Sequence, residues 1–137
     1  MKNTTKTIAL FLTLILVFGC GKDSNYEKKL SFLLEKNLDL RAYSTVVVIP
    51  GAGCAGCISH AESFFRKEKD RDDHLFVFTN IASLKTLTLK LDGLDLESMS
   101  NVILDKNNIF SIQDAPENIY PHLVVVYDGR VVEVNQL

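Results

Sequence analysis

Residues 44–57 read STVVVIPGAGCAGC. The β-branched run at 44–49 predicts a strand buried on both faces, as in the centre of an α/β sheet. Pro50 and Gly51 end this strand. A helix is expected over 57–69, because apolar residues recur there at helical spacing, namely Ile58, Ala61, Phe64 and Phe65. A pair of cysteines therefore stands between a buried strand and the start of a helix.

The motif CAGC at 54–57 has a chemical consequence in this setting. A thiolate at a helix N-terminus meets unpaired backbone N–H groups and the positive end of the helix dipole, which lower the thiol pKa. Cys57 follows Cys54 by three residues, faces the same side of the first turn and can resolve a mixed disulfide formed by Cys54. Gly51, Gly53 and Gly56 allow a tight turn and the close approach of another chain. The pattern favours dithiol–disulfide exchange.

Other interpretations of the cysteine pair remain open. An inert structural disulfide is one, although a bridge across a two-residue gap restricts the unfolded chain little. Metal binding is another, since Cys54, Cys57 and His60 have C-x-x-C-x-x-H spacing, but a second CxxC or a closing histidine pair is missing. Haem attachment is excluded, because the histidine does not follow Cys57 directly.

The N-terminus resembles a bacterial lipoprotein signal. Residues 1–7 carry two lysines and no acid, and the apolar run at 8–18 is too short for a bilayer core about 30 Å thick. The run ends in Val-Phe-Gly-Cys, so we expect residues 1–19 to be a cleaved signal peptide and Cys20 to be lipidated, for example with palmitate. An ordinary cleaved signal and a chance cysteine are the alternatives.

The remaining chain predicts one α/β domain over 28–137, joined to Cys20 by a polar tether ending at residue 27. Composition is that of a globular protein, with 47% hydrophobic and 23% charged residues. The net charge is −2, so the chain lacks the excess of positive charge that is typical of proteins that bind nucleic acid. Helices are expected at 26–37 and 83–96 and a short one within 107–118; strands are expected at 74–79, 101–104, 122–127 and 131–134, the last two joined by the turn Asp128-Gly129. This order describes helices around a mixed central sheet.

Several other residues are expected to have structural roles. Phe64, Phe65, Phe76 and Phe78 are core candidates. His74 and His122 flank strands and are expected at the surface or at strand edges, and Asp105 is expected in a simple turn. Glu62 and His60 are expected on the solvent side of the helix that follows the cysteines.

These motifs resemble the thioredoxin-like superfamily, most closely the membrane-anchored TlpA-like thiol–disulfide proteins of bacteria. The resemblance covers roughly residues 28–137 and is most specific at VVVIPGAGCAGC and NIYPHLVVVYDGRVVEV. It implies a thioredoxin-like fold with Cys54 as nucleophile and Cys57 as resolving thiol. It also implies that Pro121 is a cis-proline facing the cysteines, that Tyr120 pairs with the substrate through its backbone, and that Gly53 lies in the substrate groove.

The chain departs from the family pattern in three ways. Gly53 replaces the usual tryptophan before the first cysteine, and Gly56 replaces the usual proline before the second. The strand at 44–49 lacks the family's buried acid. The helix that follows the final hairpin in the family is not found before Leu137, so we expect one sheet face to expose apolar surface, which suggests a partner, a dimer or a degenerate member.

The sequence therefore predicts a lipid-anchored protein of the bacterial cell envelope that exchanges disulfides with extracytoplasmic client proteins. The cysteine pair carries the electrons, so no dissociable cofactor and no metal are expected. A membrane partner that supplies or accepts electrons is expected. The alternatives are a non-catalytic binding lipoprotein on the same scaffold and a copper-handling protein that uses Cys54, Cys57 and His60.

Overall fold

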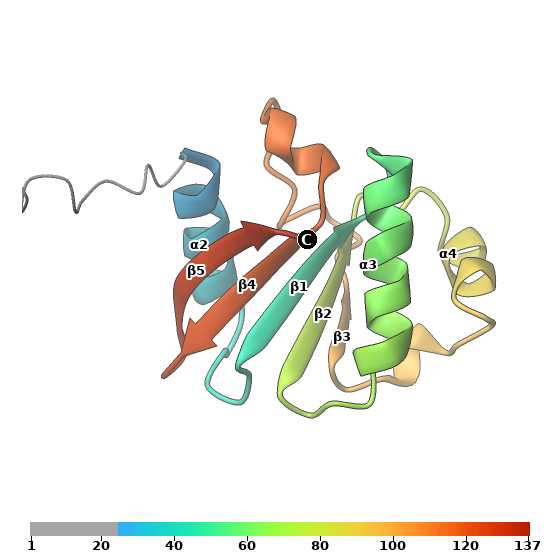
Figure 1. Cartoon of the computed structure of the whole chain (residues 1–137), viewed down its shortest axis with the longest axis horizontal. Helices are drawn as coiled ribbons and strands as arrows, with labels where there is room; N and C mark the ends of the chain where they lie inside the picture. Colours follow the sequence, from blue (N-terminus) through green and yellow to red (C-terminus); the bar gives the residue numbers. More distant parts are fainter. Residues whose placement is uncertain (1–24) are drawn as a thin grey trace, which may run out of the picture.

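The fold is an α/β arrangement around one five-stranded mixed sheet, seen in a computed structural model that describes residues 25–137 (Figure 1). The signal-peptide and lipidation predictions, including Cys20, lie outside these residues. The strands are β1 (Thr45–Pro50), β2 (His74–Thr79), β3 (Val102–Leu104), β4 (His122–Tyr127) and β5 (Arg130–Gln136). Their order in the sheet is β3-β2-β1-β4-β5. The predicted α/β class with a mixed sheet is confirmed.

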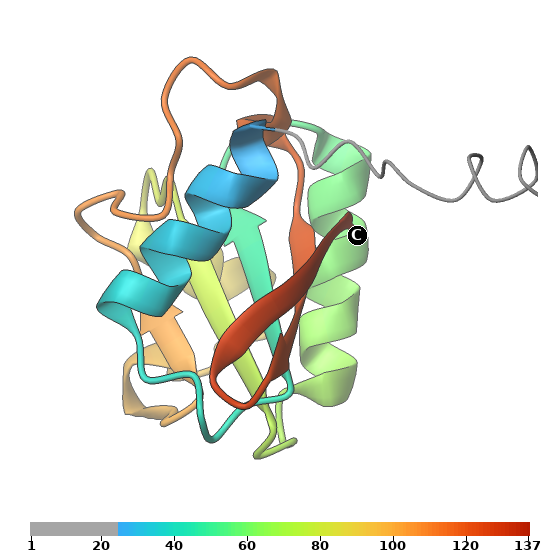
Figure 2. The same cartoon turned by 90° about the vertical axis from the view of Figure 1, so that its left-hand side faces the viewer.

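The helices lie on both faces of this sheet. They are α2 (Asn25–Asn37), α3 (Ala55–Glu68) and α4 (Leu84–Lys90), with short 3₁₀ turns η2 (Leu96–Ser98) and η3 (Pro116–Ile119). Figure 2 shows α2 on one face and α3 on the other. None of the helices within residues 25–137 is long and apolar enough to cross a bilayer.

The direction of the strands determines where the cysteine motif lies. β1 runs parallel to β2, which runs parallel to β3, whereas β4 is antiparallel to β1 and to β5. The pairing of Val48 with His122 puts the start of β4 beside the end of β1. The chain before β4 and the loop after β1 therefore meet at the same end of the sheet, although some 65 residues separate them in the sequence.

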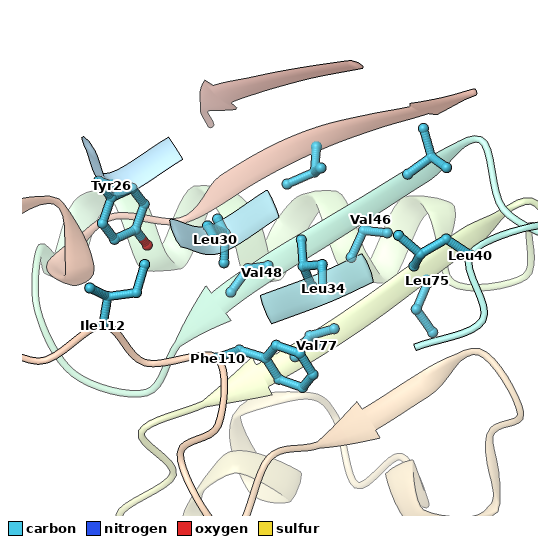
Figure 3. Packing of buried hydrophobic residues seen from close by; sticks show 12 residues of the cluster. Tyr26, Leu30, Leu34, Leu40, Val46, Val48, Leu75, Val77, Phe110 and Ile112 are labelled. Atoms are coloured by element: carbon cyan, nitrogen blue, oxygen red, sulfur yellow. The ribbon is translucent and has the colours of Figure 1, made fainter. Parts of the chain in front are cut away.

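Two apolar clusters hold the layers together. Alternating residues of β1 face opposite sides, as strand geometry requires. Val46 and Val48 pack with the buried face of α2, including Tyr26, Leu30 and Leu34 (Figure 3). On the other side, Val47 and Ile49 pack with Ala61 and Phe65 of α3 and with Phe76 and Phe78 of β2. Phe65, Phe76 and Phe78 are thus core residues as predicted, and Phe64 packs half-buried at the edge of the cluster.

The hairpin between β4 and β5 forms as the turn signal predicts. Asp128 has φ 50° and Gly129 has φ 76°, the pair of positive values that characterises a type I′ turn. A register shift at Val125/Val126 interrupts the ladder. Tyr127 and Val132 of this hairpin are 77% and 59% exposed, so part of it presents apolar surface to solvent, as expected.

Two helix boundaries differ from the prediction. The helix expected at 26–37 forms and begins one residue earlier, at Asn25, and Tyr26 in its first turn is 5% exposed and packs in the core. The helix expected over 83–96 ends at Lys90. Asp92 and Gly93 have positive φ there, a conformation that stops an α-helix. The leucine-rich pattern continued past this stop because Leu91 and Leu96 are buried outside the helix.

Three polar residues are more buried than expected. His74 and His122 are 7% and 5% exposed. Asp105 is 4% exposed and accepts hydrogen bonds from the Thr79 hydroxyl and from the backbone N–H groups of Ile109 and Phe110, at 2.8 to 3.0 Å. Asp105 is therefore buried and fixes the conformation of the loop after β3. The sequence alone did not distinguish this role from that of a residue in a surface turn.

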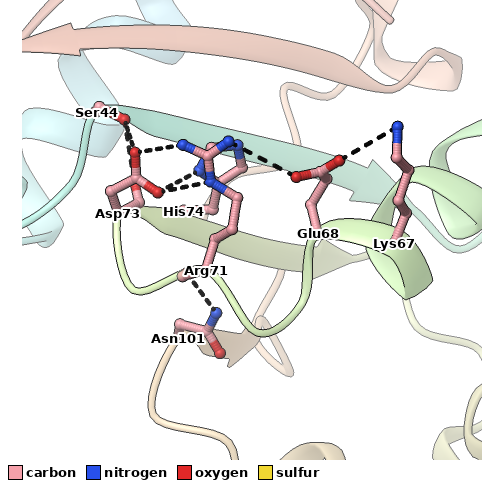
Figure 4. A network of polar contacts seen from close by, with 7 residues as sticks. All are labelled: Ser44, Lys67, Glu68, Arg71, Asp73, His74 and Asn101. Carbon is pink, nitrogen blue, oxygen red and sulfur yellow. Dashed lines mark hydrogen bonds and ion pairs between the residues drawn. The ribbon is translucent and has the colours of Figure 1, made fainter.

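His74 belongs to a polar network at the amino-terminal ends of β1 and β2 (Figure 4). The Asp73 carboxylate accepts hydrogen bonds from the Arg71 guanidinium and the Ser44 hydroxyl and lies 3.0 Å from His74 Nδ1. The hydrogen bond from Arg71 and then that from Ser44 hold the pKa of Asp73 far below its usual value. This network closes the end of the sheet opposite the cysteines.

Candidate functional site

The cysteine pair lies where the loop after β1 enters α3. Cys54 is the N-cap of the helix, with extended backbone, and its Sγ accepts a hydrogen bond from the Cys57 N–H at 3.4 Å. A side-chain acceptor at this position satisfies one of the N–H groups that a helix start leaves unpaired. The helix begins at Ala55, two residues before the predicted start.

Cys54 and Cys57 form a disulfide in this structure. Their sulfur atoms are 2.14 Å apart and their Cα atoms 5.3 Å apart. Both residues are half-buried, and their neighbours Gly53, Ala55 and Gly56 are exposed. The predicted proximity of the two cysteines is confirmed, and the pair is within reach of solvent rather than sealed in the core.

The segment before β4 contacts this loop directly. The Cys54 N–H donates to the Ile119 carbonyl at 3.1 Å. Gly53 has φ 143°, and a Cβ at that position would come within 2.8 Å of Ile119 Cα. Gly53 is therefore required both by its backbone conformation and by the close approach of a neighbouring chain.

Ile119 is a residue of the site that sequence reasoning missed. It contacts Gly53 and Cys54, yet its side chain is 44% exposed and it stands in a polar segment without strong periodicity. Only the antiparallel placement of β4 brings it to the cysteines, and nothing local in the sequence indicates that contact.

Tyr120 and Pro121 follow Ile119 and thus lie at the same end of the sheet. Tyr120 is half-buried and donates its N–H to the Glu117 carbonyl at 3.0 Å, so that N–H is already used within the chain. Pro121 is buried, and its carbonyl accepts from the Leu137 N–H at 2.9 Å. Their assignment to a substrate groove stays a prediction.

The cis configuration expected at Pro121 is wrong. No peptide bond within residues 25–137 is cis, so the Tyr120–Pro121 bond is trans. Tyr120 has extended backbone, with φ −105° and ψ 144°, which is the conformation that a following trans proline favours. Pro121 thus acts as the lead-in to β4, a position where its missing N–H costs no ladder hydrogen bond.

His122 is buried directly after Pro121. Its Nδ1 lies 3.4 Å from the Tyr26 hydroxyl, and the two rings are 4.7 Å apart. Burial lowers the pKa of His122 below its usual value, against the opposing effects of a backbone hydrogen bond with Tyr120 and the charges of Glu117 and Glu27. Burial, with a smaller effect from the charge of Glu117, raises the pKa of Tyr26 to about 12. Both groups are therefore neutral near pH 7.

Glu62 and His60 occupy different environments. His60 is exposed, as expected. Glu62 is 8% exposed, which contradicts the expectation that it faces solvent. The buried stripe of α3 is wide enough to include it, because α4 packs along that side and encloses the carboxylate with Lys90. Within residues 25–137, no group of three His, Cys, Asp or Glu side chains is arranged to hold a metal ion.

In comparisons with known proteins, no family profile, curated protein or solved structure matches the chain. What the structure establishes is an α/β fold with a five-stranded mixed sheet and a Cys-x-x-Cys disulfide at the start of a helix.

Proposed function

We propose that the protein is a thiol–disulfide oxidoreductase of the thioredoxin-like superfamily, anchored by lipid at Cys20 and acting on extracytoplasmic proteins. One observation carries the proposal: a half-buried Cys54–Cys57 disulfide lies at the N-terminal end of a helix that leaves the carboxyl end of the central strand. A location outside the cytoplasm also favours a disulfide that forms and breaks. In the cytosol, by contrast, most thiols are kept reduced.

The exchange proceeds in two balanced steps. In the reductive direction, the Cys54 thiolate attacks one sulfur of a client disulfide, forms an intermolecular disulfide and releases the other client sulfur as a thiolate. Cys57, deprotonated, then attacks the Cys54 sulfur, forms the Cys54–Cys57 disulfide and releases the second client thiolate. Two electrons pass to the client, which takes up two protons, and the oxidative direction reverses each step.

The local geometry supports this division of roles. The N-cap position of Cys54 directs its sulfur at the first N–H groups of α3, and a thiolate is stabilised by such donors and by the helix dipole. The Cys57 Cα lies 5.3 Å from that of Cys54, within the range that a disulfide spans, so the second step requires no movement of the helix. A membrane partner that supplies or removes electrons is part of the proposal.

The test is capture of the intermediate. Cys57→Ser should accumulate mixed disulfides between Cys54 and envelope proteins, visible as adducts on non-reducing gels that disappear on reduction. Cys54→Ser, with Cys57 intact, is the matched control and should capture far less. Alkylation of Cys54 in the Cys57→Ser variant should be half-maximal below about pH 7.5, against about 8.5 for an ordinary thiol. A value near 8.5 without adducts contradicts the proposal and leaves an anchored scaffold with an inert disulfide.

A further inference from the structure

A small cavity lies between α3, α4 and the carboxyl ends of β1 and β2. Its volume is about 100 Å³. Six apolar side chains line it, namely Ile49, Pro50, Phe78, Ile81, Ala82 and Leu87. An engineered cavity of about 150 Å³ takes up benzene, so this one accommodates an aliphatic chain of a few methylenes. Figure 1 shows α3 and α4 on the same side of the sheet.

Two charged residues, Glu62 and Lys90, also line the cavity. The Glu62 side chain is 10% exposed, and within residues 25–137 its only ion-pair partner is Lys90, whose Nζ is 3.9 Å from Oε1. That distance exceeds the usual hydrogen-bond range. No fully buried side-chain oxygen within residues 25–137 lacks a hydrogen-bond partner, so the Glu62 oxygens keep some access to solvent. A cationic donor that reached them would exchange the loose contact with Lys90 for charge-assisted hydrogen bonds.

Lys90 lies at the outer side of the pair. Its side chain is 54% exposed, so it can leave Glu62 for solvent at little cost. The neighbouring cation on α3, Arg66, is already engaged by Asp92 at 2.9 Å and by the Lys90 carbonyl. The cavity thus combines an apolar passage with a carboxylate whose present partner is loosely held.

We infer that this cavity is a subsite for a long basic side chain, lysine above all, of the client polypeptide. The aliphatic stem would occupy the apolar part, and the ammonium group would displace Lys90 and donate hydrogen bonds to Glu62. The inference rests on the proposed function, because it assigns the substrate class of the same protein.

The cavity is close enough to the cysteines to act on the same client segment. Gly51 lines it, and Cys54 follows Gly51 by three positions in the sequence. Their Cα atoms are therefore at most about 11 Å apart. An extended peptide rises about 3.3 Å per residue, so the basic residue lies within about three positions of the client cysteine.

The first experiment measures ligand binding without any redox step. The oxidised full chain is titrated with n-butylammonium, n-butanol and butyrate, and the NMR shifts of Ile81, Leu87 and Thr86 are followed. We expect butylammonium to bind at least tenfold more tightly than butanol. Glu62→Gln should remove that difference, and Lys90→Met should tighten butylammonium binding severalfold by removing the competing cation.

The matched control is Glu68→Gln, on the same helix but paired with Lys67 and Arg71 outside the cavity. It should leave binding unchanged. Equal binding of butanol and butylammonium, or tighter binding of butyrate that Lys90→Met abolishes, overturns the inference, because the cavity would then be merely apolar or an anion site.

The second experiment connects the cavity to disulfide exchange. Reduced protein reacts with disulfide-linked peptides that carry lysine, norleucine or glutamate three residues from the cysteine. The lysine peptide should react about tenfold faster than the norleucine peptide at low salt, and Glu62→Gln should abolish the difference. Equal rates for all three peptides contradict the subsite. If no peptide reacts although butylammonium binds, the proposed function fails while the cation site stands.

Discussion

At the scale of the residue, the two glycines of the cysteine motif differ in whether the backbone requires a glycine. Gly53 has φ 143° and lies against Ile119, whereas nothing approaches the Cβ position of Gly56 within 4 Å. Gly53 precedes Cys54 and Gly56 precedes Cys57, and at both positions the family that the motif resembles has a larger residue. Only the first is demanded by the backbone; the second lies in a helix, where glycine costs about 1 kcal/mol relative to alanine.

The two alanine substitutions should therefore have opposite effects. Gly53→Ala should lower the free energy of unfolding by about 1–3 kcal/mol and disturb the Cys54 N–H bond to Ile119, because it places a Cβ in a forbidden conformation. Gly56→Ala should raise it by about 0.5–1 kcal/mol. Denaturant unfolding of the oxidised proteins measures both. Equal destabilisation by the two changes would contradict the close approach of Ile119.

At the scale of the element, the burial of a side chain of α2, and not its size, determines how much it contributes to the stability of the fold. Tyr26, Leu30 and Leu34 recur at a spacing of four on one side of α2, and Leu30 and Leu34 are fully buried. Phe32 is instead 62% exposed, with Lys36 above its ring. A helix of 13 residues is marginal in isolation, so its stability derives from the packed face.

Leu34→Ala should consequently cost about 2–5 kcal/mol, since it opens a cavity in the cluster shared with Val46 and Val48. Phe32→Ala, which removes a larger side chain from the same helix, should change the free energy of unfolding by less than about 0.5 kcal/mol. Thermal or urea denaturation of both variants checks the contrast. Comparable losses would mean that a further surface covers Phe32.

Elements with a strong local pattern were predictable from the sequence, and those set by long-range contacts were not. The strands at 74–79 and 122–127 have the predicted bounds, because continuous apolar runs between polar residues define them. The end of α4 was not predictable, since buried leucines continue after the chain leaves the helix at Asp92. The cysteine pair was found by its spacing, whereas Ile119 and the buried Glu62 depend on how β4 and α4 pack.

At the scale of the whole molecule, His122 connects three separate parts of the chain. It pairs with Val48 of β1, contacts Tyr26 at the start of α2 and follows the segment that reaches the cysteines. Tyr26 is one of three buried residues, with Leu30 and Leu34, through which α2 contacts the sheet. A change in the charge of His122 therefore acts on the packing of α2 as well as on the start of β4.

The lowered pKa of His122 sets the direction of its effect on stability. Below the unfolded-state value of about 6.5, the unfolded chain binds a proton that the folded chain does not, so the free energy of unfolding falls as the pH decreases, until the folded-state pKa is passed. His122→Gln should reduce the slope of stability against pH between about 6.5 and 5, measured by urea unfolding at each pH. His60→Gln, at an exposed position on α3, is the control and should retain the slope. If the slope persists in His122→Gln and disappears in His60→Gln, the buried pair with Tyr26 is not the group that titrates, and α2 is held to the sheet by its apolar face alone.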